Sequence, residues 1–248
     1  MYKYELHMHT SEGSACARNT GAEMVDFYIN MGYAGMVVTD HFYHGNTAPD
    51  RSLPWQEFIA QYTKGYESAK KAAEGKDFDV FFGVEVKGAE WDEYIILGLS
   101  PEWYAGHPEL RDTVGIVFLD MVRDAGAFII HAHPYRERAY MLSKTIPLFS
   151  DHIDAIEVRN CGNPPEVDRR ALEYARKLNL PMTGGSDKHA SEGLASSLSG
   201  IALPFRCHTV EELIDAIRQK KQRVLDIECA EAAPLTEPTF TVKPQQDT

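Results

Sequence analysis

Residues 20–41 read TGAEMVDFYINMGYAGMVVTDH and carry the clearest indication of the fold. Thr20 and Glu23 form a capping box before an apolar helical pattern, and Gly32 lies where a helix commonly ends. A short apolar run follows the glycine, and a similar run at residues 4–9 precedes the helix. This order of strand, helix and strand favours parallel pairing with a right-handed crossover.

The same alternation continues along the chain. Apolar runs that predict strands occupy residues 35–40, 80–86, 94–99, 128–131, 155–159 and 181–183, with further candidates at 200–203 and 224–227. Helical patterns lie between them at residues 54–74, 110–125, 166–179 and 209–220. We therefore predict a single α/β domain, a closed or nearly closed β/α barrel over residues 1–227, followed by a C-terminal tail at residues 228–248.

The composition argues against some classes of partner. The chain has 248 residues, 44% of them hydrophobic and 25% charged, which is ordinary for a globular domain. Its formal net charge of −12 opposes the basic surface that long nucleic acid or an anionic membrane requires, so we expect neither partner. With no apolar segment as long as a membrane span and no basic leader, a cytoplasmic protein is expected. The oligomeric state is left open.

Several common types of site leave no trace in the sequence. The cysteines Cys16, Cys161, Cys207 and Cys229 form no C-x-x-C pair, which predicts free thiols rather than a zinc ribbon or a disulfide framework. The G-x-S-x-G nucleophile motif, the phosphate-binding P-loop and the H-E-x-x-H helix are absent as well. None of these motifs therefore accounts for a functional site in this chain.

The candidate metal ligands share one feature of position. They lie where a predicted strand gives way to a loop: His7, His9, His41, Glu85, His131, His133, Asp187 and His189. Because the carboxyl ends of parallel barrel strands open on one face, these side chains should converge in space. Imidazole and carboxylate suit zinc, iron or manganese, and one carboxylate can bridge two cations. We therefore expect two or three divalent transition metal ions (Zn, Mn or Fe).

Each candidate also has a structural interpretation. A single histidine is usually a surface or hydrogen-bonded residue, which is the expectation for His44, His107, His152 and His208. Glu85 could pair with Lys87, although a carboxylate inside an apolar strand is costly unless a cation meets it. Asp187 could cap the loop that follows it, but its spacing to His189 favours a ligand.

Short motifs at these positions occur in a recognisable order. They are His-x-His at 7–9, Thr-Asp-His at 39–41, Gly-Val-Glu at 83–85, Ala-His-Pro at 132–134, Ile-Glu-Val-Arg-Asn at 156–160 and Gly-Ser-Asp-Lys-His at 185–189. Over residues 1–227 the set resembles the polymerase and histidinol phosphatase (PHP) superfamily. The resemblance implies a distorted seven-stranded β/α barrel whose di- or trinuclear metal centre hydrolyses phosphate esters.

The resemblance also implies a ligand set. It gives one ion the ligands His7, His9, Glu85 and Asp187, a second ion the bridging Glu85 with His133, and a third ion His41 and His189. Asn160 is either a further ligand of the second ion or a structural residue. His131 would lie behind the ligands and contact them rather than the ion. Members of the family commonly carry aspartate or histidine shortly after the second histidine, where this chain has Ser14 and Ala15. Glu12 is the candidate replacement.

The expected chemistry follows from charge. Two cations that share a water lower its pKa towards about 7 and neutralise phosphate oxygens, which allows in-line attack on phosphorus. With such a centre, the expected catalytic residues are Glu85, His41 and Asp187. Cationic side chains next to the motifs are expected to bind phosphate: Arg136 first, then Arg18, with Arg159 and Lys188 as further candidates. For each arginine a solvated surface position is an equally good interpretation.

These observations predict metal-dependent hydrolysis of a phosphate ester. The substrate would be a small phosphate monoester, such as histidinol phosphate or a nucleotide, or a short oligonucleotide end, with no long nucleic acid and no membrane as partner. Two alternatives stay open: hydrolysis of a C–N bond by a similar metal-activated water, and a non-catalytic metal-binding module.

Overall fold

The structure is a computed structural model that describes residues 1–88, 92–137, 149–192 and 198–232. Its strands belong to one nine-stranded sheet with the order β7-β6-β5-β4-β3-β2-β1-β8-β9. They are β1 (Tyr2–Glu5), β2 (Gly35–Val38), β3 (Asp79–Lys87), β4 (Glu93–Leu97), β5 (Phe128–Ala132), β6 (Ala155–Asn160), β7 (Met182–Gly185), β8 (Ile201–Leu203) and β9 (Arg223–Val224).

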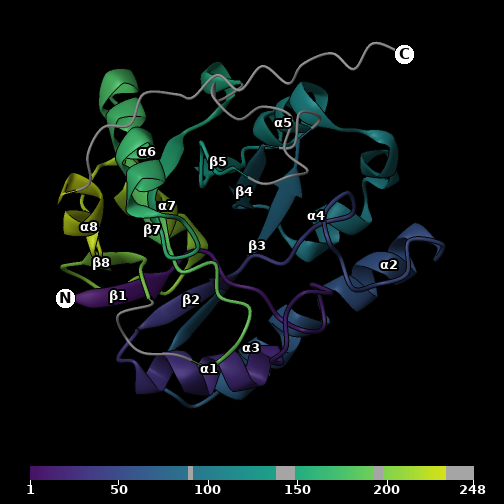
Figure 1. Ribbon diagram of the computed structural model, residues 1–248. Coiled ribbons are helices and arrows are strands. Elements are labelled where there is room, and N and C mark those ends of the chain that lie inside the picture. Colours follow the sequence, from purple (N-terminus) through teal and green to yellow (C-terminus); the bar gives the residue numbers. More distant parts are fainter. Residues whose placement is uncertain (89–91, 138–148, 193–197, 233–248) are drawn as a thin grey trace, which may run out of the picture.

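The sheet curls until its two ends nearly meet. β7, at one end of the order, packs against β8 and β9 at the other end. Gly184 permits this approach, because a Cβ there would lie 2.7 Å from Ser199 Oγ and 2.9 Å from Val224 Cγ1. The nearly closed barrel confirms the predicted α/β architecture (Figure 1).

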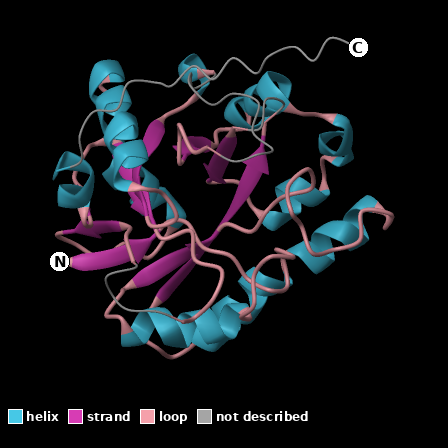
Figure 2. Ribbon diagram, viewed as in Figure 1, coloured by secondary structure: helices cyan, strands magenta, loops and turns pink. Residues whose placement is uncertain are grey.

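Helices surround the strands, as Figure 2 shows. They are α1 (Gly21–Asn30), α2 (Trp55–Tyr62), α3 (Lys64–Ala73), α4 (Pro101–Ala105), α5 (Gly115–Asp124), α6 (Pro165–Leu178), α7 (Val210–Arg218) and α8 (Ile227–Ala232), with short 3₁₀ helices at Pro108–Asp112 and Ser150–His152. The predicted capping box forms at α1: the Thr20 hydroxyl accepts from the backbone N–H of Glu23 at 3.3 Å, and the Glu23 carboxylate accepts from the N–H of Thr20 at 2.7 Å.

Strand direction departs from the all-parallel expectation. β4 and β8 run against the other strands, since β4 pairs antiparallel with β3 and β5, and β8 pairs antiparallel with β1 and β9. A parallel crossover needs about a dozen or more residues, and only residues 88–92 separate β3 from β4. The two strands therefore form a hairpin, and β4 begins at the rim where β3 ends.

Other boundaries also differ from the expectation. The helical pattern at 54–74 is divided between α2 and α3, and a short helix, α4, lies in a segment for which no helix was predicted. The strand expected at 224–227 stops at Val224, because Asp226 adopts a left-handed backbone conformation and α8 begins at Ile227.

The end of the chain agrees only in part with the expected tail. α8 packs against α6, with Ala230 buried, so residues 228–232 cover the barrel wall as a helix. Residues 233–248 lie outside the described residues, and the domain boundary at 227 stays a prediction. Within the described ranges no helix combines the length and the apolar character needed to cross a membrane.

Aromatic packing fixes the loop that follows β2. The Phe42 ring makes edge contacts with Trp55 and Phe58 of α2, with centroids 6.0 and 6.3 Å apart. The backbone N–H of Phe42 donates to the Glu85 carbonyl at 2.7 Å, and the N–H of Glu85 donates to the Asp40 carbonyl at 3.0 Å. Pairing of β2 with β3 thus continues up to the rim and holds the residue between them, His41, beside Glu85.

Candidate metal centre

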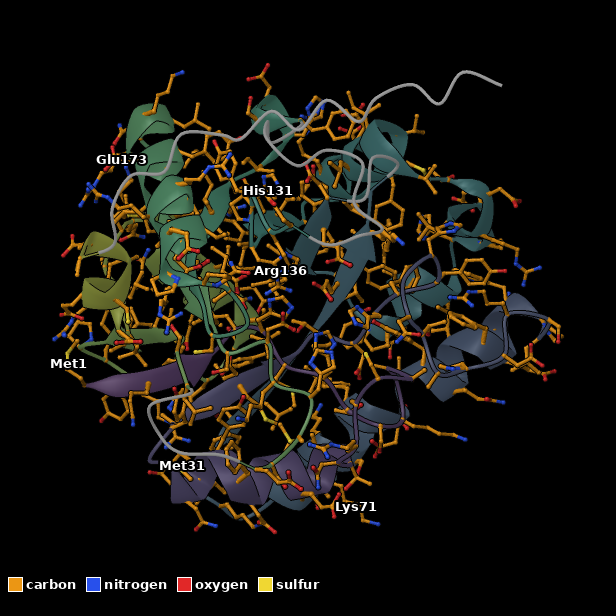
Figure 3. The ribbon with its side chains drawn as sticks, viewed as in Figure 1. Met1, Met31, Lys71, His131, Arg136 and Glu173 are labelled. Atoms are coloured by element: carbon orange, nitrogen blue, oxygen red, sulfur yellow. The ribbon has the colours of Figure 1, made fainter. Side chains whose placement is uncertain are left out.

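Most of the predicted ligands converge at one cavity at the rim of the barrel. The cavity has a volume of about 650 Å³, and its lining includes Cys16, His41, Glu85, Lys87, Glu93, Arg136, Asp187 and His189. Arg136 is labelled near the centre of Figure 3, inside the ring of strands. Residues nearly two hundred positions apart thus meet as the strand-end argument predicted.

Glu85 lies at the middle of the cluster, with imidazoles around both carboxylate oxygens. Its Oε1 is 3.1 Å from His7 Nε2 and 3.0 Å from His133 Nε2. Its Oε2 is 2.6 Å from His41 Nδ1 and 3.6 Å from His9 Nε2. This is the arrangement that a carboxylate bridging two cations requires.

Asp187 closes the cluster on the side of β7. Its Oδ1 lies 3.2 Å from His9 Nε2 and 3.6 Å from His7 Nε2, while its Oδ2 accepts from Arg136 Nη1 at 2.6 Å. Asp187 and His133 both have positive φ, 52° and 29°. Such strained conformations cost about 1–3 kcal/mol each and persist where the surroundings impose them, which is typical of functional sites.

Supporting side chains orient the first two histidines. His7 Nδ1 lies 3.0 Å from Glu157 Oε1, and His9 Nδ1 lies 3.2 Å from Ser14 Oγ. The Ser14 hydroxyl donates in turn to Asp40 Oδ1 at 2.7 Å. Because a partner on Nδ1 fixes the ring and leaves Nε2 for a ligand, both histidines aim Nε2 into the cluster, the arrangement usual for metal-binding imidazoles.

The charges of the cluster are strongly coupled. Burial alone would raise the pKa of the Glu85 carboxyl, but the charges of His7 and His41 outweigh burial and hold that pKa well below its usual range. Burial would lower the pKa of His7, yet the carboxylates of Glu157, Asp187 and Glu85 raise it well above its ordinary value. Burial and the charge of His41 lower the pKa of His9 to about 3. His9 is therefore neutral at pH 7, as a metal ligand must be.

The donor atoms fit metal ions. Three groups of predicted ligands have donor atoms within 4.8 Å of one another: His7 with His9 and Glu85, His7 with His133 and Asp187, and His9 with His41 and His189. His7 Nε2, Glu85 Oε2 and His133 Nδ1 are buried without an aligned hydrogen-bond partner in the described part of the chain. Buried polar atoms of this kind are costly unless a ligand satisfies them, so cations suit these positions.

Two predicted ligands lie elsewhere. The Glu12 carboxylate accepts from the backbone N–H of Gly21 at 3.2 Å and so caps the start of α1. Asn160 Oδ1 accepts from Arg136 Nη2 at 2.6 Å and from the N–H of Gly162 at 2.8 Å. Among the described His, Cys, Asp and Glu residues, Glu12 belongs to no group of donors close enough to share an ion. The Oδ1 atom of Asn160 is thus already engaged by two donors, and its role as a ligand stays a prediction.

Three of the four cationic candidates point away from the cavity. Arg159 pairs with Asp168 at 2.9 Å and with Asp226 at 2.8 Å, where an irregularity of β6 between Glu157 and Arg159 interrupts the alternation of faces. Arg18 is exposed and pairs with Glu192 at 3.3 Å. The ammonium of Lys188 lies 5.9 Å from the centroid of the Phe27 ring on α1. Only Arg136 lines the cavity as expected.

His131 also faces away from the cluster. Its ring stacks on Tyr94 with centroids 4.8 Å apart and lies 6.2 Å from the Tyr174 ring of α6. Burial and the charge of His133 lower its pKa to about 3. His131 therefore packs as a neutral ring between the sheet and α6, and Figure 3 labels it apart from Arg136.

Sequence reasoning missed three titratable residues of the cavity wall: Cys16, Lys87 and Glu93. Glu93 begins β4 and escaped attention because only strand ends were considered. Burial and the nearby charge of Glu85 raise its pKa above the ordinary value. Cys16 was regarded as a plain thiol, although its side chain hydrogen-bonds with His189 and His41. Lys87 was considered only as a partner for Glu85.

Comparisons with known proteins bear on the fold. A family model described as "PHP-associated" matches residues 165–221. A two-domain protein of Bacteroides vulgatus that contains a predicted PHP-like metal-dependent phosphoesterase has 15% sequence identity and a TM-score of 0.68, over 90% of this chain and 64% of that one. The chain has the PHP fold. The predicted resemblance to the PHP superfamily is thereby confirmed.

Other solved structures have a similar fold. PsfC of Pseudomonas syringae has 15% identity and a TM-score of 0.61, with 93% of each chain covered. Endonuclease Q, in complex with a 27-mer duplex that carries an abasic lesion, has 13% identity and a TM-score of 0.58, over 88% of this chain and 56% of that one. This chain thus spans less than two thirds of both the Bacteroides protein and endonuclease Q. No curated protein sequence matches.

The endonuclease complex corrects one expectation. From the net charge of −12 we excluded long nucleic acid as a partner. Endonuclease Q has a similar fold and holds duplex DNA at its active site, so the exclusion is wrong. Net charge describes the whole surface and does not decide what one cavity of a PHP barrel binds.

Proposed function

We propose that this protein is a metal-dependent phosphoesterase. The observation that carries the proposal is the position of Glu85, a buried carboxylate with His7 and His133 about one oxygen and His41 about the other. Such a carboxylate is suited to hold two cations at a short separation, which is the arrangement of two-metal hydrolytic centres.

The proposed ligands follow from the same contacts. One ion would be held by His7, His9, Glu85 and Asp187, a second by Glu85 and His133, and a third by His41 and His189. Manganese, zinc and iron all suit imidazole and carboxylate donors. When bound, such ions supply hydroxide from water at neutral pH and neutralise phosphate oxygens.

Arg136 is the proposed phosphate-binding residue. Its guanidinium donates to Asp187, Asn160 and Asn163, at 2.6, 2.6 and 2.8 Å. These bonds hold the positive charge at the cavity wall beside the proposed ligand Asp187. A preorganised cation at this place favours the charge that develops on phosphate oxygens during ester cleavage. Lys87 adds a second positive charge to the same wall.

The substrate class that we propose is a phosphate ester small enough for its reacting group to enter the cavity. A volume of about 650 Å³ lies within the range of small-molecule sites. A small phosphate monoester, a nucleotide and a phosphorylated or abasic end of nucleic acid all present such a group. The endonuclease Q complex, which has a similar fold, supports the inclusion of DNA.

The test uses the full chain loaded with manganese, zinc or iron(II). Its panel contains an aryl phosphate, nucleoside monophosphates, end-phosphorylated oligonucleotides, an abasic duplex and a set of amides. We expect phosphate or nucleotide release that a chelator abolishes and that metal restores. Glu85→Gln should lose both bound metal and activity, whereas Arg18→Ala, which alters only an exposed side chain, should retain both. Release from amides alone would replace the proposal with C–N hydrolysis, and no release from any substrate would refute it.

A further inference from the structure

Glu93 lies at the same rim as the proposed metal ligands, although it starts a strand rather than ends one. In the sheet it pairs with Lys87 at the end of β3 and with Ala132 at the end of β5, directly before His133. Its side chain is only 9% exposed, and its Oε2 lies 3.4 Å from His133 Nε2. The hairpin between β3 and β4 thus brings one more carboxylate to the cavity.

Glu93 is within reach of the bridging carboxylate as well. Its donor oxygen lies within 4.8 Å of donor atoms of Glu85 and His41, which lie within the same distance of each other. Glu85 in turn lies 3.0 Å from His133. Glu93 therefore contacts or approaches both residues proposed for the second ion.

The other oxygen donor considered for that ion is engaged elsewhere. Asn160 Oδ1 accepts two hydrogen bonds, from Arg136 and from Gly162, and its Nδ2 donates to Glu157 Oε2 at 2.9 Å. An ion at Glu85 and His133 would have to break one of these bonds to reach Asn160. Glu93 needs no such rearrangement, because it already faces the cavity.

Charge also distinguishes a ligand from a structural ion-pair partner. A direct side-chain contact with His133 would explain the 3.4 Å distance to Glu93. It would not explain why two buried carboxylates, Glu85 and Glu93, approach each other, since like charges out of water repel strongly. A divalent cation shared by Glu85, Glu93 and His133 neutralises both.

We propose that Glu93 is a ligand of the second ion, together with Glu85 and His133, in the place that the family resemblance suggested for Asn160. The inference rests on the proposed function, because it concerns the same metal centre. Two carboxylates and one imidazole make an oxygen-rich donor set, and additional carboxylate donors favour manganese over softer metals.

The experiment measures metal binding rather than turnover. The full chain is stripped with a chelator and titrated with Mn²⁺, and bound metal is counted by elemental analysis after equilibrium dialysis. Glu93→Gln should weaken one of the bound ions at least about tenfold, as loss even of an outer-sphere partner can do, and leave the remaining ions at wild-type affinity. Glu93→Asp keeps the charge, and its affinity for that ion should lie between those of Glu93→Gln and the wild type.

Asp92→Asn is the matched control. Asp92 is the preceding residue and is also a buried carboxylate, but its Oδ2 lies 3.7 Å from His131, which packs on the other side of the sheet. This variant should bind Mn²⁺ as the wild type does. Thermal unfolding of the stripped proteins checks that each variant folds; if Glu93→Gln does not, Glu93→Asp decides.

The outcomes separate this inference from the proposed function. Wild-type stoichiometry and affinity in Glu93→Gln, or in Glu93→Asp where only that variant folds, overturn the assignment of Glu93 and leave the phosphoesterase proposal standing. A wild-type chain that binds no metal overturns both. Equal losses in Asp92→Asn and Glu93→Gln show a general effect of removing a buried charge and also overturn the assignment.

Discussion

Replacing Arg136 with methionine should show whether this buried guanidinium contributes to catalysis as well as to stability. The substitution removes three hydrogen bonds from a guanidinium whose side chain is 8% exposed, and it leaves Asp187 without its 2.6 Å partner. Breaking a buried ion pair costs about 3–5 kcal/mol. We expect about 3 kcal/mol, because the charge of His7 and the 3.2 Å contact with the neutral His9 ring still stabilise Asp187. For a chain of this size that corresponds to a fall in Tm of roughly 6–12 °C.

The same substitution should reduce catalysis. If the Arg136 charge stabilises phosphate oxygens in the transition state, its loss should lower kcat/KM by about 10²–10³-fold, the usual effect of removing one such donor. The assays are thermal unfolding of the metal-free protein and initial rates on the best ester of the panel. The rates are measured well below the Tm of the variant, so that only folded protein is compared.

Arg159→Met is the matched control for this prediction. Arg159 is also a buried arginine with carboxylate partners, Asp168 and Asp226, but it faces away from the cavity. Its variant should lose stability and keep kcat/KM. Equal losses of kcat/KM in both variants, or an unchanged kcat/KM in Arg136→Met, would refute the role given to Arg136.

Three further predictions follow from other contacts. Metal binding to the stripped protein should release protons and should weaken as pH falls. The raised pKa values of His7 and His41 keep both rings protonated near neutrality, and a metal must displace those protons. A calorimetric binding enthalpy that does not depend on the ionisation heat of the buffer would contradict this prediction. Burial raises the pKa of the Cys16 thiol, but hydrogen bonds with His189 and His41 lower it to about 6. In metal-free protein at pH 7, iodoacetamide should therefore alkylate Cys16 faster than the exposed Cys229, and Cys16→Ser should remove the fast phase. Equal alkylation rates for the two thiols would contradict the lowered pKa. Gly184→Ala should destabilise the protein by about 1–3 kcal/mol through overpacking against Ser199 and Val224. Gly106→Ala is the control and should be nearly neutral, because its Cβ would meet only atoms 3.5 Å away. Equal denaturation midpoints for the two variants would show that the barrel does not close at Gly184.

Local sequence signals predicted much of the fold. The capping box at Thr20 and Glu23 forms in α1, and the alternation of apolar runs with helical patterns corresponds to a nearly closed barrel. His7, His9, Glu85 and Asp187 meet because each follows or ends a strand whose direction was inferred correctly. Position at strand ends was therefore a sound guide where strands are parallel.

Nearness in sequence was a poor guide to the phosphate-binding residue. Arg159 lies two residues after Glu157, which contacts His7, but an irregularity of β6 between Glu157 and Arg159 interrupts the alternation of faces, and Arg159 meets Asp168 and Asp226 instead. Lys188 lies between Asp187 and His189 but extends over Phe27. The choice among the cationic residues depended on side-chain direction, which the motif spacing does not contain.

The direction of β4 explains why Glu93 was missed, and the sequence contained the signal that would have found it. The apolar runs predicted at 80–86 and 94–99 leave only seven residues between them, fewer than a parallel crossover needs. An antiparallel hairpin was therefore the only short connection available. In a hairpin the start of the second strand meets the end of the first, so an acidic residue that begins the second strand reaches the same rim as Glu85. Searching a β/α barrel for ligands should thus include the first residue of any strand that follows its neighbour too closely for a helix.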